Sequence, residues 1–186
     1  MLVIYGTSLS ATKGLNLNNL NSKPDNDLRE AFARCCGATD WVDGMLAQRP
    51  YISSADLHEK AKAVYRDLQT DDYLEAFTHH PKIGGDLAKL REKFATTADW
   101  SGSEQASVNQ ASEEILKRLA AGNDAYYEKF GYIFIVCATG KTAQEMLELL
   151  EARLPNDPAD EIKIAAGEQE KILEIRLNKL LNEISS

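Results

Sequence analysis

The sequence predicts an all-α protein, folded as a compact single domain of about eight helices. From Asp27 almost to its end, the chain repeats apolar residues at the spacing that places them on one face of a helix, as at Leu57, Ala61 and Val64. Only residues 132–138 have the composition of a strand, and a single strand has no neighbour with which to form a sheet. We therefore expect residues 132–138 to be a short extended segment or part of a helix.

Capping residues and helix breakers set the expected bounds of the helices. Gly37 ends the first helix, Asp40 and Thr142 cap later ones, and Asp157-Pro158 is a strong helix start. In chain order, the expected helices run from Asp27 to Gly37, Asp40 to Pro50, Ser53 or Ser54 to Leu68, Asp71 to near His79, Asp86 to Phe94, Gly102 to about Gly131 with a break or bend at Gly122-Asn123, Thr142 to Leu150, and Asp157 to Leu180.

The composition narrows the classes of function. The 186 residues carry 29 acidic and 21 basic side chains, a net charge of −8, which argues against a general nucleic-acid surface. No stretch approaches the roughly 18 apolar residues that cross a membrane, and the apolar start of the chain is too short for a signal peptide. The cysteines are Cys35, Cys36 and Cys137, which cannot form a paired disulfide framework. We expect a soluble cytoplasmic protein without membrane or nucleic-acid partners.

The first candidate for catalysis is His80, which precedes Pro81 at the expected end of a short helix. Histidine is the side chain best suited to transfer protons near neutral pH. The alternative is that His79 and His80 only cap the helix, where the negative end of the helix dipole favours them. We expect no metal site, because adjacent histidines point to different faces and His58 has no partner at ligand spacing.

A second candidate comprises Ser101, Gly102, Ser103, Glu104 and Gln105. Ser101 and Glu104 have the spacing of a capping box, which alone explains both residues as the start of a helix. A helix start also presents free N–H groups that suit an anionic ligand. Gln105 offers a donor and an acceptor, as recognition of a urea or amide group requires.

The third candidate is the apolar segment that precedes Gly140-Lys141-Thr142. A phosphate-binding loop would need glycine at the position of Ile135, so the spacing argues against this nucleotide site. Burial in the core is the simple explanation for residues 133–136. However, an extended backbone outside a sheet has N–H and C=O groups that need partners, and a polar ligand could be one of them.

The fourth candidate is Arg176, in the last expected helix. A guanidinium group can hold a carboxylate through two hydrogen bonds. The alternative is a surface arginine paired with a neighbour such as Glu174.

Together these segments resemble the 2-oxo-4-hydroxy-4-carboxy-5-ureidoimidazoline (OHCU) decarboxylases of urate degradation, and their bacterial branch most closely. The resemblance extends from about Leu15 to Leu181, which makes residues 15–186 the family-like helical domain and residues 1–14 a variable N-terminal extension. The matching motifs are His80-Pro81 with Ile83-Gly84, Ser101-x-x-Glu104-Gln105, Phe130-Gly131-Tyr132-x-Phe134-Ile135-Val136-Cys137-Ala138, Asn156-Asp157 and Lys171-Ile172-x-x-x-Arg176-Leu177.

The resemblance implies an all-helical homodimer without a cofactor that converts a small ureidoimidazoline carboxylate to (S)-allantoin and CO2. It implies that His80 is the catalytic histidine, followed by Pro81, and that Glu104 orients or polarises it. The implied substrate-binding residues are Pro81, Ser101, Gly102, Ser103, Glu104, Gln105, Phe134, Ile135, Val136, Cys137, Ala138 and Arg176. Two other readings stay open: a helical binding module without catalysis, and a nucleotide-binding protein that uses Gly140-Lys141-Thr142.

Overall fold

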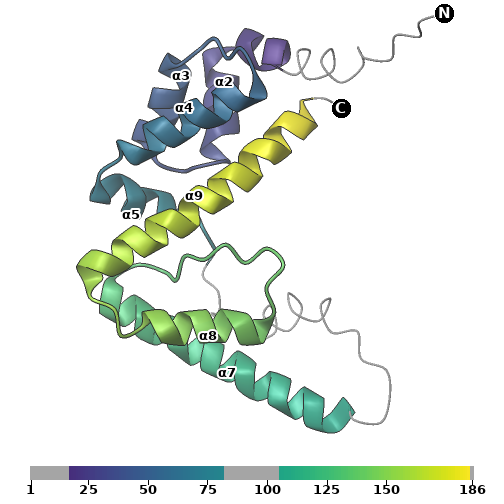
Figure 1. Ribbon diagram of the computed structural model, residues 1–186, viewed down its shortest axis with the longest axis vertical. Helices are drawn as coiled ribbons and strands as arrows, with labels where there is room; N and C mark the ends of the chain where they lie inside the picture. The colour runs from purple at the N-terminus through teal and green to yellow at the C-terminus, as the bar shows by residue number, and fades with distance from the viewer. Residues whose placement is uncertain (1–16, 82–104, 185–186) are drawn as a thin grey trace, which may run out of the picture. The chain divides into compact units, whose positions relative to one another are not determined.

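The computed structural model describes residues 17–81 and 105–184, with the side chains of 105–112 excepted (Figure 1). Within these ranges the chain forms helices and no strand, which confirms the all-α fold class. The expected helix from Asp86 to Phe94 and the N-terminal extension lie outside the described residues. By its contacts the chain divides into two compact units: unit 1 comprises Met1–His79 with Glu170–Ser186, and unit 2 comprises His80–Gln169.

Unit 1 contains four helices of the N-terminal half and the second part of a long C-terminal helix. They are α2 (Asp25–Ala33), α3 (Thr39–Ala47), α4 (Ser54–Arg66), α5 (Thr70–Thr78) and α9 (Pro158–Glu183), of which residues 170–183 belong to this unit. A further helical segment covers residues 17–22.

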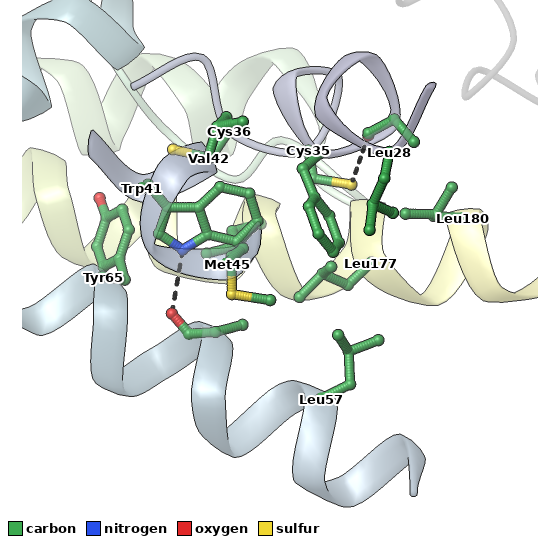
Figure 2. Packing of buried hydrophobic residues seen from close by; sticks show 14 of the residues in the cluster. Leu28, Cys35, Cys36, Trp41, Val42, Met45, Leu57, Tyr65, Leu177 and Leu180 are labelled. Atoms are coloured by element: carbon green, nitrogen blue, oxygen red, sulfur yellow. Dashed lines mark hydrogen bonds between the residues drawn. The ribbon is translucent and has the colours of Figure 1, made fainter. Parts of the chain in front are cut away.

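The core of unit 1 forms where α2, α3, α4 and α9 bring their apolar faces together (Figure 2). Leu28, Trp41, Leu57 and Leu177 are almost fully buried there, and burial of each such side chain contributes about 1.5–3 kcal/mol. The indole Nε1 of Trp41 donates to the carbonyl of Ala61 at 3.1 Å, so the polar atom of this core residue is satisfied.

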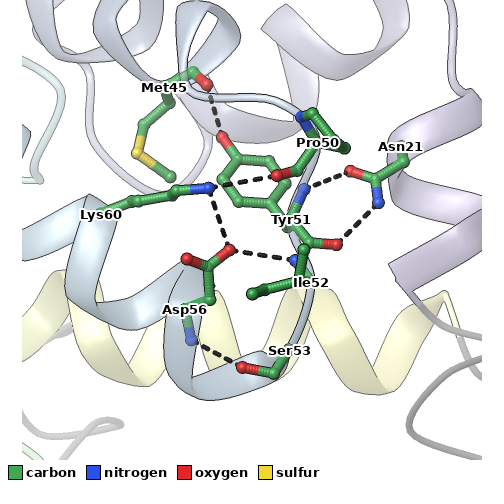
Figure 3. Close-up of polar contacts among 8 residues, drawn as sticks. All are labelled: Asn21, Met45, Pro50, Tyr51, Ile52, Ser53, Asp56 and Lys60. Carbon is green, nitrogen blue, oxygen red and sulfur yellow. Dashed lines mark hydrogen bonds and ion pairs between the residues drawn. The ribbon is translucent and has the colours of Figure 1, made fainter.

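The connection from α3 to α4 contains the cis peptide bond Arg49-Pro50 and is fixed by side chains (Figure 3). The amide of Asn21 pairs with both main-chain groups of Tyr51, at 2.9 Å to the N–H and 2.8 Å to the carbonyl. The buried Tyr51 hydroxyl donates to the carbonyl of Met45. Asparagine thus provides the pairing that a neighbouring strand would provide in a sheet.

The start of α4 follows its expected cap. The hydroxyl of Ser53 accepts the N–H of Asp56 at 3.0 Å, as the sequence predicted. Asp56 in turn accepts the N–H of Ile52 at 3.0 Å and the ammonium group of Lys60 at 3.0 Å. The hydrogen bond from Ile52, followed by that from Lys60, lowers the pKa of Asp56.

Two expectations about unit 1 are wrong. Helix α2 ends at Ala33, because the N–H groups of Cys35 and Cys36 both turn back to the carbonyl of Phe32. Gly37 does not end the helix, and its lack of a side chain lets the chain pack closely against His79. Asp40 lies inside α3 and is not its cap; the N-cap position is Ala38, which has no capping side chain.

Unit 2 contains α7 (Gln105–Phe130), α8 (Ala143–Arg153) and the first part of α9, with α7 packed along α8 (Figure 1). The expected break at Gly122-Asn123 does not occur, since α7 is helical through both residues. A Cβ atom at Gly122 would meet Leu150 of α8 at 2.7 Å, so this glycine permits the close approach of the two helices.

The starts of α8 and α9 follow the sequence prediction. Thr142 and Glu145 form a capping box at α8. The carboxylate of Asp157 accepts the N–H of Ala159 at 2.9 Å, and Pro158 is the first residue of α9. These local signals therefore fix the residues at which α8 and α9 begin.

Residues 133–138 between α7 and α8 are extended and mostly buried, as one of the two expectations for this segment stated. Gly131 and Gly140, with φ of 78° and 76°, lie on either side of the segment. Both adopt the left-handed region that favours glycine. No helix among the described residues is long and apolar enough to cross a membrane.

Candidate active site

His80 lies directly beyond the C-terminus of α5. His79 takes the C-cap position, where its N–H donates to the carbonyl of Ala76 at 3.2 Å. His79 is exposed, whereas His80 is half-buried and precedes Pro81. The two histidines therefore differ in position and in exposure, and the catalytic role of His80 stays a prediction.

The end of α5 is held to the start of α3. The carboxylate of Glu75 accepts the N–H of Thr39 at 2.9 Å and its hydroxyl at 2.7 Å. The hydrogen bonds from the Thr39 hydroxyl and then from its N–H lower the pKa of Glu75, against a smaller opposing effect of burial. Gly37 packs directly against His79, since a Cβ atom there would lie 2.3 Å from the imidazole ring. The chain that leads into His80 is thus anchored from two sides.

Arg176 is half-buried on α9 and lines a cavity of about 570 Å³ within unit 1. Its Nη1 is 3.4 Å from the carbonyls of both Arg34 and Cys35, the long end of hydrogen-bonding range. Glu174 pairs with Lys62. A surface pair between Arg176 and Glu174 therefore does not describe this arginine.

The cavity beside Arg176 is predominantly basic. Arg34 and Lys179 line it together with Arg176, and Glu183, which pairs with Arg34, is its acidic member. Such a lining suits an anion such as a carboxylate. Cys35 also lines this cavity, but burial raises its pKa to about 12 against the opposing charge of Arg176, so its thiol is no nucleophile near neutral pH.

Charged side chains hold the backbone of the extended segment. The carbonyl of Ile135 accepts Nη1 of Arg153 at 2.8 Å. The N–H of Cys137 donates to Glu168 at 2.7 Å, and its carbonyl accepts Nζ of Lys141 at 2.7 Å. Backbone contacts between a ligand and this segment would have to use other peptide groups than those of Cys137.

Arg153 also belongs to a polar cluster that is buried except for the half-buried Asn156 and that the sequence did not predict. It consists of Tyr126, Arg153, Asn156 and Glu161, and the Glu161 carboxylate accepts hydrogen bonds from the other three. Burial, followed by the hydrogen bond to Glu161, raises the pKa of Tyr126. Arg153 lies in the last turn of α8 and Glu161 in the first turn of α9, where the helix dipoles favour a positive and a negative charge respectively. Because each charge has this local explanation, the sequence gives no indication that the two residues pair.

Several expected site residues cannot be placed. Ser101, Gly102, Ser103 and Glu104 lie outside the described residues, and Gln105 is the first residue of α7 in the structure, with no description of its side chain. The convergence of His80, Glu104 and Arg176 stays a prediction. The described residues include no group of three or more His, Cys, Asp or Glu that could hold a metal ion.

The residues of the nucleotide-binding alternative have structural partners. Nζ of Lys141 binds the Cys137 carbonyl, and the side chain of Thr142 caps α8 through Glu145. Neither arrangement resembles a loop that presents its N–H groups and lysine to a phosphate.

The comparisons with known proteins agree with these features. The family model described as OHCU decarboxylase matches residues 21–178. The Arabidopsis thaliana uric acid degradation bifunctional protein TTL is 37% identical over 151 residues, 80% of this chain and 46% of that protein. The Amia calva 2-oxo-4-hydroxy-4-carboxy-5-ureidoimidazoline decarboxylase is 30% identical over 134 residues, 72% of this chain and 75% of that protein.

A crystal structure of an OHCU decarboxylase in the presence of (S)-allantoin is also similar. It has a TM-score of 0.66 and 34% sequence identity, over 86% of this chain and 99% of that chain. The chain spans less than half the length of three bifunctional relatives, with 46%, 33% and 33% covered. The expected link to the bacterial branch is not confirmed, since the plant relative is 37% identical and the Bacillus subtilis relative 26%. The match over residues 21–178 covers most of the sequence, and the chain belongs to the OHCU decarboxylase family.

Proposed function

We propose that this chain converts OHCU to (S)-allantoin and CO2. The observation that carries the proposal is the similarity to an OHCU decarboxylase structure over 99% of that chain, since it covers the relative's whole domain. The position of His80 beyond the cap of α5 and the basic cavity at Arg176 support it.

The chemistry needs few groups. The carbon that carries the carboxylate neighbours a C=N unit of the ring. When the bond to the carboxylate breaks, CO2 leaves and the electron pair passes into this C=N unit. The pair ends on the ring nitrogen, which takes up a proton as the enol forms. The enol is then protonated on the carbon that bears the ureido group, and its hydroxyl releases its proton as it becomes the carbonyl of allantoin, so one proton is consumed for each CO2 released. The ring itself accepts the electrons, so the reaction requires no cofactor.

In this proposal His80 supplies the proton to one face of the ring, and Glu104 orients its imidazole. Arg176 binds the anionic carboxylate, as the basic lining of its cavity favours. Gln105 and the start of α7 bind the ureido group, while Pro81 and residues 134–138 complete the pocket. Preorganised donors of this kind stabilise the negative charge that develops as CO2 leaves.

Substitution of His80 tests the proton donor. His80→Asn should lower kcat by about 10²–10⁴-fold, the usual contribution of general acid catalysis. The matched control is His58→Asn, because His58 is also half-buried and bonds only a side chain of α9, Asn178, at 3.2 Å. Product chirality is followed by circular dichroism on freshly generated substrate. A His80→Asn enzyme that forms one enantiomer at near wild-type rate would refute the role of His80.

Substitution of Arg176 tests the carboxylate site. Arg176→Ala should chiefly raise KM, because it removes a charge that binds substrate and transition state alike. Arg29→Ala is the control, since Arg29 pairs with Asp43 on the surface of unit 1. Steady-state kinetics of CO2 release measure both, and an unchanged KM for Arg176→Ala would contradict the assignment.

We also propose that the protein is a homodimer and cytoplasmic. The family resemblance supports the dimer, and the adjacent cysteines Cys35 and Cys36, which are not joined in a disulfide, support a reducing compartment. Light scattering after size-exclusion chromatography measures the oligomeric state, and a monomer at micromolar concentration would contradict the proposal.

A further inference from the structure

The extended segment between α7 and α8 poses a structural problem. Its peptide groups lie in the interior without a neighbouring strand among the described residues, yet buried N–H and C=O groups need partners. Arg153, Glu168 and Lys141 provide partners for Ile135 and Cys137. Side chains from other elements thus take the place of a sheet.

Arg153 contacts two consecutive residues of the segment. Its Nη1 donates to the Ile135 carbonyl at 2.8 Å, and its guanidinium carbon lies 4.6 Å from the centre of the Phe134 ring. A hydrogen bond in the plane of the guanidinium and a ring on its face fix both the position and the rotation of the chain at this point. Lysine could not reproduce this arrangement.

Glu161 fixes Arg153 in turn. Its Oε1 lies 2.7 Å from Nε and 2.5 Å from Nη2 of the arginine, and both side chains are almost fully buried. Oε2 of Glu161 accepts the amide of Asn156 at 2.7 Å, and the Tyr126 hydroxyl donates to Oε1. Neither charged group can rotate without the loss of several hydrogen bonds.

Stability alone does not account for this pair. Replacement of a buried ion pair by apolar residues of similar volume is often neutral or stabilising, because burial of two charges costs desolvation energy. What apolar residues cannot do is donate a hydrogen bond to the carbonyl of Ile135. The particular effect of the pair is therefore geometric.

We propose that Arg153 and Glu161 are positioning residues that hold residues 134–137 in the geometry required for substrate contact. The inference rests on the proposed function, in which residues 134–138 line the substrate pocket. A displacement of about 1 Å in a positioned group can cost about 10²-fold in rate. Movement of this segment would also let the substrate ring shift in the pocket. The ring would then be protonated on both faces, and the allantoin formed would lose enantiomeric excess.

The central experiment is an apolar replacement, Arg153→Met with Glu161→Leu. It removes both charges together and replaces them by apolar side chains, so the double variant should still unfold cooperatively. Its Tm should lie below the wild-type value, because the Ile135 carbonyl and the Tyr126 hydroxyl each lose a hydrogen-bond partner. Its kcat/KM should fall about 10–100-fold, and the enantiomeric excess of its allantoin should fall as well. Met45→Ala, in the core of unit 1, serves as a destabilised control. Assayed at temperatures well below its Tm, it should keep the wild-type kcat/KM and enantiomeric excess.

Two conservative variants keep the proposal testable if the double variant does not fold. Arg153→Lys retains the positive charge but loses the planar guanidinium with its several N–H donors. Tyr126→Phe removes only the hydroxyl that donates to Glu161. Arg153→Lys should reproduce the kinetic defect, with a smaller one in Tyr126→Phe. Wild-type kcat/KM and chirality in folded Arg153→Lys would overturn the proposal.

Amide hydrogen exchange of residues 134–137 separates this inference from the proposed function. Faster exchange of these amides in Arg153→Lys than in the wild type supports the positioning role, even if the wild type proves to lack decarboxylase activity. Unchanged exchange overturns the positioning role, whatever the activity of the wild type.

Discussion

At Gly37 the packing leaves room for a hydrogen atom but not for a methyl group. A Cβ atom would lie 2.3 Å from the imidazole of His79, the residue before the proposed proton donor. Gly37→Ala should lower the free energy of unfolding by about 1–3 kcal/mol, the usual cost of overpacking, and should also lower kcat. Urea denaturation and CO2 release measure the two effects.

Gly167→Ala is the control for this substitution. Gly167 lies inside α9, and a Cβ atom there meets nothing within 4 Å. Alanine is the better helix former by about 0.5–1 kcal/mol, so the control should be more stable than the wild type. Equal stability of Gly37→Ala and the wild type would mean that His79 can move aside freely.

Other single residues show where reasoning from the sequence succeeds. Ser53, Thr142 and Asp157 cap the helices that follow them, because a cap acts over two or three residues and is written locally. The pairing of Arg153 with Glu161 joins two different helices, and each side chain has a plausible local explanation. A single sequence gives no reason to prefer the pairing.

The same limit applies to helix α3. Its start lacks a local capping side chain and is satisfied by Glu75 of α5, 36 residues further along the chain. The sequence predicts Asp40 as the cap because it directly precedes Trp41, the first apolar residue of the expected helix. The spacing of apolar residues predicts that α3 exists. The carboxylate that accepts the N–H at its start comes from another helix, so only the tertiary structure identifies it.

The link between α5 and α3 predicts a pH dependence. The hydrogen bonds from Thr39 lower the pKa of Glu75 in the folded protein. Its contribution to stability is therefore present above the unfolded-state value of 4.5 and is lost as pH falls through the lower folded-state pKa. Glu75→Gln should be less stable than the wild type near neutral pH, and the difference should shrink in acid.

Urea denaturation between about pH 3 and pH 7 measures this difference. Glu148→Gln, an exposed substitution on α8, is the control. A constant difference between Glu75→Gln and the wild type over this range would show that the charge of Glu75 does not stabilise the fold.

For the molecule as a whole, the sequence predicted the helical class and most helices but not the division of contacts into two units. The class follows from spacing and from the lack of a second strand. The candidate site is predicted by motifs, and its convergence depends on residues 101–104, which the described part of the chain does not include. Local patterns specify elements, whereas a site also requires their mutual placement.

Tyrosines in both units predict how the whole molecule responds to alkali. Burial raises the pKa of five tyrosines above the usual value of 10, namely Tyr51, Tyr65, Tyr73, Tyr126 and Tyr132. Above about pH 10 the unfolded chain loses these protons while the folded one keeps them, so stability should fall as pH rises further. Guanidinium denaturation at a series of pH values measures this decline, and a flat profile up to pH of about 11.5 would contradict it.

The segment from Tyr132 to Cys137 has a consequence beyond the proposed site. Its six residues are uncharged, rich in β-branched and aromatic side chains, and mostly buried in the folded protein. These are the properties of a peptide that stacks into a steric zipper. The side chains that bind its backbone therefore also keep this segment from pairing with other chains. When unit 2 unfolds on heating, the protein should form cross-β aggregates and should not refold on cooling.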